Sequence, residues 1–279
     1  MTTHLPEHRK DPVTPAPGRE IKEKTIAGTL RPDQRKGILA VLWVLLSGLI
    51  PSACAGNKLD IEAALVTAGY NDVAVPGDKG TRFSLTDDLH ARETAGFRLR
   101  YSRAFSRKHW IGILAAPLTM DSQGTLKTDI DFNGTTFGED RTINAKYRFD
   151  SYRLIYRYHL HQADNLQFSF GAALKVRDAS IELESGLLRA KKENTGLVPL
   201  LSFYLAWKPF RKLSFMIDGE ALAASQGRAE DVLFAAEYDV NDSLALKIGY
   251  RLLEGGADND EVYTFSLFHY AVVGAGLSF

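Results

Sequence analysis

The sequence predicts an all-β protein, a single closed antiparallel β-barrel whose strands cross a membrane. Three observations predict this fold. Apolar and polar residues alternate with a period of two over most of residues 57–279. The longest apolar run, residues 38–50, is too short for a membrane-spanning helix. Ten alternating segments are joined by short turns and by mostly longer polar loops in turn, which is the asymmetry of a membrane barrel.

Residues 1–55 are predicted to form a leader that ends in a secretory signal peptide. A basic pair precedes the apolar run, and Ala53 and Ala55 provide the small side chains of an Ala-x-Ala cleavage site. We therefore expect cleavage after Ala55 and a barrel domain over residues 56–279.

Residues 1–34 are rich in proline and charge and are longer than an ordinary n-region, so we expect translation to start near Leu30. A lipoprotein signal is the alternative interpretation of Cys54, but Pro51 stands where such a signal favours leucine. Because Cys54 is the only cysteine, the predicted mature domain has neither disulfides nor thiol chemistry.

The charge balance argues against a nucleic-acid partner. The chain carries 34 Lys and Arg and 34 Asp and Glu, whereas nucleic-acid binding favours a basic excess or a basic face. Removal of residues 1–55 takes away eight basic and five acidic residues and leaves 26 against 29, a net charge of −3.

Ten strands are expected, with eight as the fallback because the second and third segments are the weakest. They are placed at 59–70, 94–106, 109–122, 141–160, 166–184, 196–208, 212–225, 229–240, 244–255 and 262–279. The longer loops then fall at 71–93, 123–140, 185–195, 226–228 and 256–261. Pro117 and Pro199 inside strands predict bends or bulges, and Trp110 and Trp207 are predicted to form an aromatic girdle near the short turns.

The last strand carries the most specific pattern. Val273, Ala275, Leu277 and Phe279 lie on one face and end the chain with an aromatic residue. This pattern resembles the C-terminal signature of bacterial outer-membrane β-barrels. The resemblance implies a Gram-negative outer-membrane location, lipid and lipopolysaccharide as surroundings, and contact of this strand with the barrel-assembly machinery.

The opposite faces of the strands are strongly charged and are expected to line the lumen. A three-residue turn at 241–243 pairs outward Val240 with outward Leu244, and the same register sets Glu237 opposite Lys247 as an expected ion pair. The predicted lumen cations are Arg98, Arg100, Arg153, Arg157, Lys175, Arg177, Lys247 and Arg251, and the anions are Asp60, Glu62, Asp218, Glu220, Glu237 and Asp239.

In a barrel of eight to ten strands side chains largely fill the lumen, so this set predicts an ion network that plugs and stiffens the barrel. A narrow pore with a cationic constriction that favours anions is the alternative.

No enzyme motif is complete. Asp87, Asp88 and His90 superficially resemble the paired acids and histidine of the omptin proteases, but no His-Asp couple follows on a later strand. The acidic tip at 258–261 lacks EF-hand spacing, and no phosphate loop or zinc pattern occurs, so no cofactor or metal is expected.

The predicted function is therefore non-enzymatic: a structural or interaction barrel with limited small-solute passage. Two alternatives stay open. One is an outer-membrane hydrolase with an active site on the rim of the barrel. The other is a soluble periplasmic carrier resembling the lipocalins, which would need its apolar face turned inward.

Overall fold

The computed structural model describes residues 56–224 and 227–279, and all regular structure within them is β. The predicted leader, its 1–34 segment and the cleavage residues Ala53 and Ala55 lie outside the described residues. Across the described part of the chain, no helix has the length and apolar character needed to cross a membrane.

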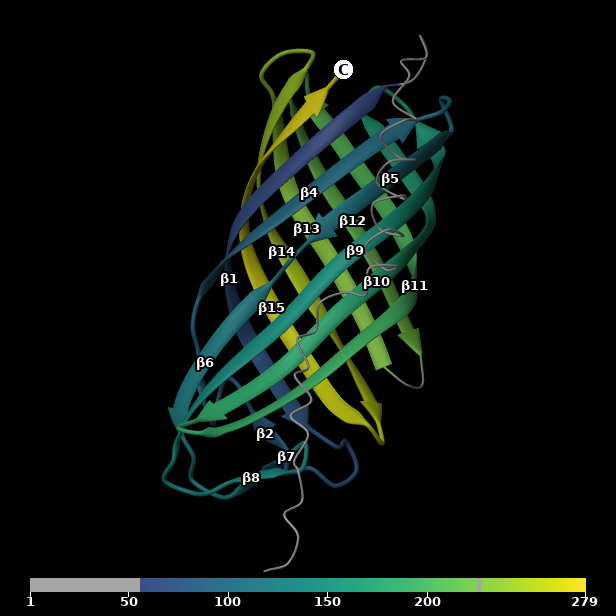
Figure 1. Cartoon of the computed structure of the whole chain (residues 1–279). Coiled ribbons are helices and arrows are strands. Elements are labelled where there is room, and N and C mark those ends of the chain that lie inside the picture. The colour runs from purple at the N-terminus through teal and green to yellow at the C-terminus, as the bar shows by residue number, and fades with distance from the viewer. Residues whose placement is uncertain (1–55, 225–226) are drawn as a thin grey trace, which may run out of the picture. The chain divides into compact units, whose positions relative to one another are not determined.

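Ten strands form one closed antiparallel barrel, as predicted, because β15 pairs back with β1 (Figure 1). The third wall strand consists of two pieces, β5 and β6, which both pair with β9. The barrel strands are β1 (Asn57–Ala74), β4 (Thr94–Ala104), β5 (His109–Ala116) with β6 (Thr119–Thr125), β9 (Thr142–Gln162), β10 (Leu166–Ser185), β11 (Leu188–Phe210), β12 (Leu213–Ala224), β13 (Gly227–Asp239), β14 (Leu244–Asn259) and β15 (Val262–Ser278).

The two ends of the barrel differ. At the terminal end, which we define by Asn57 and Phe279, the Asn57 amide donates to the Phe279 carbonyl at 2.9 Å and the connections are short. At the opposite loop end lie the longer connections with four short strands, β2 (Phe83–Ser84), β3 (His90–Ala91), β7 (Ile130–Phe132) and β8 (Thr135–Phe137).

Two of the predicted long loops are wrong, because the strands continue through them. The segment 185–195 belongs mostly to β11, and the hairpin turns at Gly186, whose φ of 60° suits glycine. The segment 256–261 is a hairpin with only Asp260 and Glu261 between β14 and β15. In both places the outward residues become polar, which weakens the alternation although backbone pairing continues.

The two strand prolines lie where the wall changes neighbours. Pro117 separates β5, which pairs with β4, from β6, which pairs with β3. Pro199 stands in β11 just beyond Leu201, the last residue that pairs with β12. At such an edge position the missing proline N–H interrupts no ladder of hydrogen bonds.

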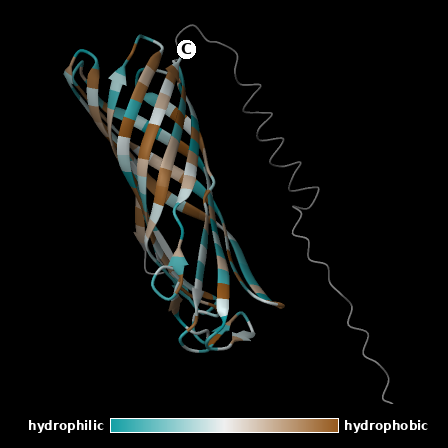
Figure 2. Cartoon of the chain, turned by 90° about the vertical axis from the view of Figure 1, so that its left-hand side faces the viewer, coloured by the Kyte–Doolittle hydropathy of each residue, from teal (hydrophilic) through white to brown (hydrophobic). Residues whose placement is uncertain are grey.

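The outward face is apolar around most of the barrel, as Figure 2 shows by its brown bands. Ile248 and Phe97 are 66% and 60% exposed on this face. Val273, Leu277 and Phe279 are likewise exposed, and Ala275 is half-buried. An exposed apolar belt on a closed barrel matches a surface that meets lipid rather than water.

The prediction of an aromatic girdle places Trp110 at the correct end of the barrel but on the wrong face of the wall. Trp207 is 52% exposed on the outside, whereas Trp110 lies inside, with its ring 5.2 Å from the Arg157 guanidinium. The alternation of β5 explains this, because Trp110 shares its face with the buried Leu114.

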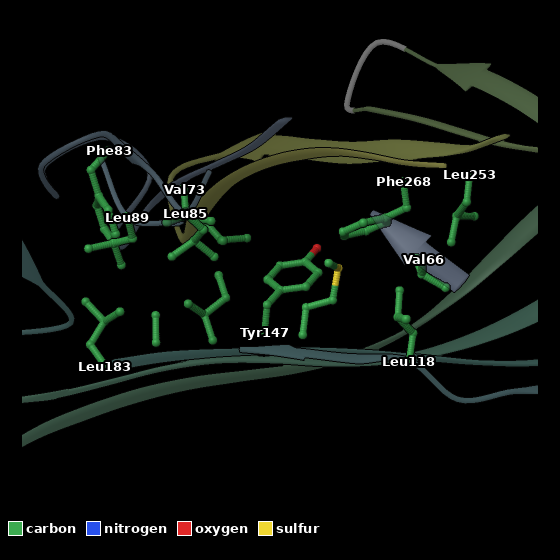
Figure 3. Close-up of a cluster of buried hydrophobic side chains, with 14 of the residues drawn as sticks. Val66, Val73, Phe83, Leu85, Leu89, Leu118, Tyr147, Leu183, Leu253 and Phe268 are labelled. Atoms are coloured by element: carbon green, nitrogen blue, oxygen red, sulfur yellow. The ribbon is translucent and has the colours of Figure 1, made fainter. Parts of the chain in front are cut away.

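The loop-end half of the interior is apolar. Side chains from residues 75–93 and 126–141 pack against inward-facing side chains of the wall. Figure 3 shows Leu85 and Leu89 on one side of this cluster and Leu183 and Tyr147 on the other. We call this cluster the apolar plug. Its main members are Val73, Phe83, Leu85, Leu89, Ile130, Phe132, Phe137, Ile143, Tyr147, Leu183, Leu253 and Phe268.

Candidate functional site

The other half of the interior is charged. Fifteen inward-facing side chains form what we call the charged layer, and they come from β1, β4, β9, β10, β12, β13 and β14. Its nine cations are Lys58, Arg98, Arg100, Arg153, Arg157, Lys175, Arg177, Lys247 and Arg251, and its six carboxylates are those of Asp60, Glu62, Asp218, Glu220, Asp231 and Glu237.

Asp231 on β13 is the hub of this layer. Its carboxylate lies 2.6 Å from both Arg153 and Arg251 and 3.0 Å from Arg98. The three guanidiniums come from β9, β14 and β4, so one carboxylate ties together strands on different sides of the barrel. Arg251 is fully buried and Asp231 is 2% exposed.

Two further carboxylates complete the pairing on β12. Glu220 lies 2.5 Å from Arg153 and 3.3 Å from Arg157. Asp218 accepts from Arg157 at 2.6 Å and also from Arg100. Arg153 and Arg157 therefore each contact two carboxylates, which suits the planar fork of guanidinium donors.

The β1 carboxylates bind the cations of β14. Glu62 lies 2.7 Å from Arg251 and 2.8 Å from Lys247, and Asp60 lies 2.6 Å from Lys247. Glu237 is contacted instead by Lys58, at 3.3 Å.

The predicted register of Glu237 opposite Lys247 is present, but the predicted ion pair between them is wrong. Lys247 reaches past β15 to the β1 carboxylates. The reason is geometric: side chains in a narrow barrel also meet residues on other strands, and register fixes only the adjacent pair.

Lys175 and Arg177 on β10 differ from the other cations. Within the described residues neither lies within ion-pair distance of a carboxylate. Lys175, 2% exposed, contacts the Phe149 ring at 4.5 Å, and Arg177 donates to Asn194 at 2.5 Å. Asp239, predicted to line the lumen, lies at the terminal end and pairs with Lys208.

Asp231 and Lys58 are the two members of the charged layer that were not predicted from the sequence. The signal was available, because Asp231 is separated by an even number of positions from Glu237, which was placed in the lumen. What the sequence could not show is that three guanidiniums converge on it.

A polar cavity of about 210 Å³ lies in the terminal-end half of the barrel. It is lined by part of the charged layer together with Trp110, Tyr204 and His159. His159 Nδ1 lies 2.6 Å from the Ser169 hydroxyl. Ser169 is completely buried, and within the described chain no carboxylate contacts His159, so this pair lacks the exposed nucleophile and oriented base of a hydrolase.

In the first loop, the Asp88 side chain holds the backbone in place. Asp88 accepts from the Ser84 amide at 2.8 Å, and His90 lies in β3 opposite Gln123. At the acidic tip, Asn259 accepts from the amides of Glu261 and Val262, both at 3.0 Å. Over residues 56–224 and 227–279, no group of three or more His, Cys, Asp or Glu side chains is arranged to hold a metal ion.

Comparison with known proteins gives structural likeness only. No protein-family model and no curated protein matches the sequence. Among solved structures, the outer-membrane protease OmpT of Escherichia coli superposes with a TM-score of 0.54 at 9% identity, over 80% of this chain and 97% of that chain.

Two other solved barrels match more loosely. Ail, the attachment invasion locus protein of Yersinia pestis, has a TM-score of 0.36 at 12% identity over 81% of this chain and 99% of its own. The translocator domain of NalP from Neisseria meningitidis has a TM-score of 0.39 at 9% identity over 88% and 96%. The closed ten-stranded sheet, its apolar outer belt and the OmpT superposition identify the fold. The chain has the fold of a small Gram-negative outer-membrane β-barrel.

Proposed function

We propose that this chain is a non-enzymatic protein of the Gram-negative outer membrane that acts through its loop-end surface and does not serve as an open channel. The observation that carries the proposal is the blocked interior. Along one lumen, a layer of buried ion pairs is followed by an apolar plug built from the loops and the wall.

The charged layer blocks the lumen because most of its members are bound to each other. Arg153 and Glu220 are 4% and 1% exposed and lie 2.5 Å apart. A solute or hydrated ion would have to break several such contacts at once, and removal of one partner of a buried pair costs about 3–5 kcal/mol. The limited solute passage expected from the sequence is therefore confined to minor, transient openings.

The outward apolar belt supports the outer-membrane location over a soluble carrier. A carrier that resembles a lipocalin would turn its apolar face inward along the whole barrel. Here Ile248 and Phe97 face outward, and the loop-end half alone has an apolar interior.

Location is tested by membrane fractionation combined with heat-modifiability on a gel. We expect the protein in the outer-membrane fraction, with different mobility before and after boiling because a closed barrel resists detergent until it is heated. A periplasmic protein with a single mobility would overturn the proposal.

Channel function is tested by single-channel recording in planar lipid bilayers. We expect no steady conductance from the wild type. As a matched opening variant we choose Arg153→Ser combined with Glu220→Ser, which removes a pair without leaving either charge alone and should raise the frequency of openings. Stable ohmic steps from the wild type would contradict the blocked lumen.

A further inference from the structure

Three positive charges of the charged layer are not balanced by its own carboxylates, since nine cations face six acids among the described residues. Two of the surplus cations, Lys175 and Arg177, occupy successive inward positions of β10, about 7 Å apart along the strand. Burial of unpaired charge is costly, so this place favours a bound anion.

A hollow beside Arg177 offers further polar groups. It has a volume of about 30 Å³ and is lined by Arg177, Lys192, Asn194 and Thr264, among others. Two atoms here, Arg177 Nε and Thr264 Oγ1, are buried without a hydrogen-bond partner. Both can donate to an oxygen anion, and Lys192 lies at the same place with its partner Glu261 in solvent.

The barrel wall is incomplete next to this hollow. Toward the terminal end β11 lies between β10 and β12, but its pairing with β12 stops at Leu201. From there to Leu188, β11 keeps β10 on one side, and the other edge is contacted by Asn133, which donates to the Lys191 carbonyl at 2.8 Å. Figure 1 shows β11 running past the β12–β13 hairpin.

Gly196 leaves this opening clear. It is the register partner of Arg177 on β11, and a Cβ placed there would stand 3.6 Å from Arg177 Nη2. Because glycine has no side chain, no side-chain atom of this β11 residue covers the guanidinium.

The opening also lies at the border of the apolar belt. On β10 the outward residues change from Val176 to Asp178, and on β11 they change from Leu197 to Thr195. In a membrane barrel this change marks the interface, where lipid phosphates lie.

From these contacts we infer a phosphate-binding site inside the barrel wall, formed by Arg177, Asn194 and Thr264, attracted by Lys175, and entered sideways past Gly196. The hollow fits phosphate oxygens and not a whole lipid, so the glycolipid body or the solvent would stay outside. The site opens sideways at the interface, so the inference does not depend on whether the lumen conducts.

The first experiment titrates inorganic phosphate onto the purified protein in detergent micelles and measures binding by calorimetry. Arg177→Gln should weaken binding about tenfold or more, because it removes a charged partner of the anion. Lys175→Met should weaken binding by a smaller factor, because Lys175 attracts the anion from about 7 Å along the strand. Lys175→Met also removes an unpaired buried charge, so this variant should fold. Arg148→Gln is the matched control, since Arg148 lies outside the barrel and pairs with Asp178 and Asp150; its affinity should change less than twofold.

The second experiment distinguishes the source of the phosphate. The protein is reconstituted in phosphatidylcholine vesicles that contain lipid A or dephosphorylated lipid A, and its thermal unfolding midpoint is compared. Protection by lipid A alone assigns the site to a lipid headgroup, and loss of that protection in Gly196→Leu confirms the sideways entry. Binding of inorganic phosphate without lipid protection assigns it to free phosphate. Absence of both effects, or equal effects in Arg177→Gln and Arg148→Gln, overturns the inference.

Discussion

In the charged layer, Arg153 and Arg251 are buried among carboxylates contributed by other strands, whereas in the apolar plug Leu85 and Phe132 are buried among loop and wall side chains of their own kind. Both regions exclude water from the same barrel. They differ in what closes them: the strands alone close the charged layer, and folded connections close the plug. A side chain can therefore be buried in this barrel whether it is charged or apolar, provided that its neighbours are of a kind that can pack against it.

The difference has a physical cause. Where the outer face meets lipid, the alternating strand places the polar side chains inside, and these must find partners there. Beyond the apolar belt, the wall can place polar residues outside, as with Glu182 and Lys191, and apolar ones inside. The loops then cover the inside as they would in a water-soluble domain.

The largest effect is expected at the hub. Asp231→Ala leaves Arg98, Arg153 and Arg251 with an uncompensated buried charge, so the free energy of unfolding should fall by about 3–5 kcal/mol. Urea unfolding of the refolded protein in lipid vesicles measures it. Asp239→Ala is the control, because its pair with Lys208 is partly exposed and is expected to contribute less than about 1 kcal/mol. Equal effects of the two substitutions would show that Asp231 stabilises the barrel no more than an acid at the terminal end does.

A cavity in the plug should cost slightly less and leave the lumen closed. Leu85→Ala removes a fully buried side chain, and we expect a loss of about 2–5 kcal/mol of unfolding free energy. Limited trypsin digestion should cut faster at Lys127 and Arg141 in the loosened loops. The conductance should stay at the wild-type level, because the charged layer is intact; steady channels in this variant would show that the plug alone blocks the lumen.

Placement in the membrane is tested on the outer face. Ile248 pairs with Val273, which lies six residues before the end of the chain. At about 2.6 Å of height per residue, this position is near the middle of the bilayer. Ile248→Lys should therefore cost about 2–4 kcal/mol in vesicles. Leu187→Lys, at the fully exposed hairpin tip, should have no measurable effect. A harmless Ile248→Lys would place this face in water.

The smallest expected effects are coupling energies, which distinguish residues that are only register neighbours from residues that form an ion pair. A double-mutant cycle on Lys247 and Glu62, which lie 2.8 Å apart, should give a coupling energy of about 1–3 kcal/mol. The same cycle on Lys247 and Glu237 should give about 0.5 kcal/mol or less, because each binds another partner. A larger coupling energy for Lys247 and Glu237 than for Lys247 and Glu62 would show that the register neighbours form the ion pair.

These cases also show how far the sequence reaches. Alternation assigns Arg98, Lys175 and Arg251 to the lumen and places Val273 and Leu277 on the outside, because the side of a strand is a local property. It does not give the convergence on Asp231, because contacts across a barrel depend on the stagger of all ten strands.

The loop end was less predictable still. Residues 75–93 and 126–141 contain β strands of only two or three residues, so their apolar side chains show no period that would reveal an interior plug. The sequence also does not show that β10 continues to Ser185 and that β11 begins at Leu188. Both faces of this hairpin carry polar residues, so its strands lack a clear alternation.

Closure of the lumen at the charged layer can be measured by the accessibility of single cysteines. The sequence after residue 55 has no cysteine, so each introduced thiol reports alone. In oriented vesicles, a membrane-impermeant maleimide should label Gln167→Cys, which lines the terminal-end cavity, and should leave the buried Ala173→Cys unlabelled from either side. Rapid labelling of Ala173→Cys from both sides would show that the lumen is open at the charged layer.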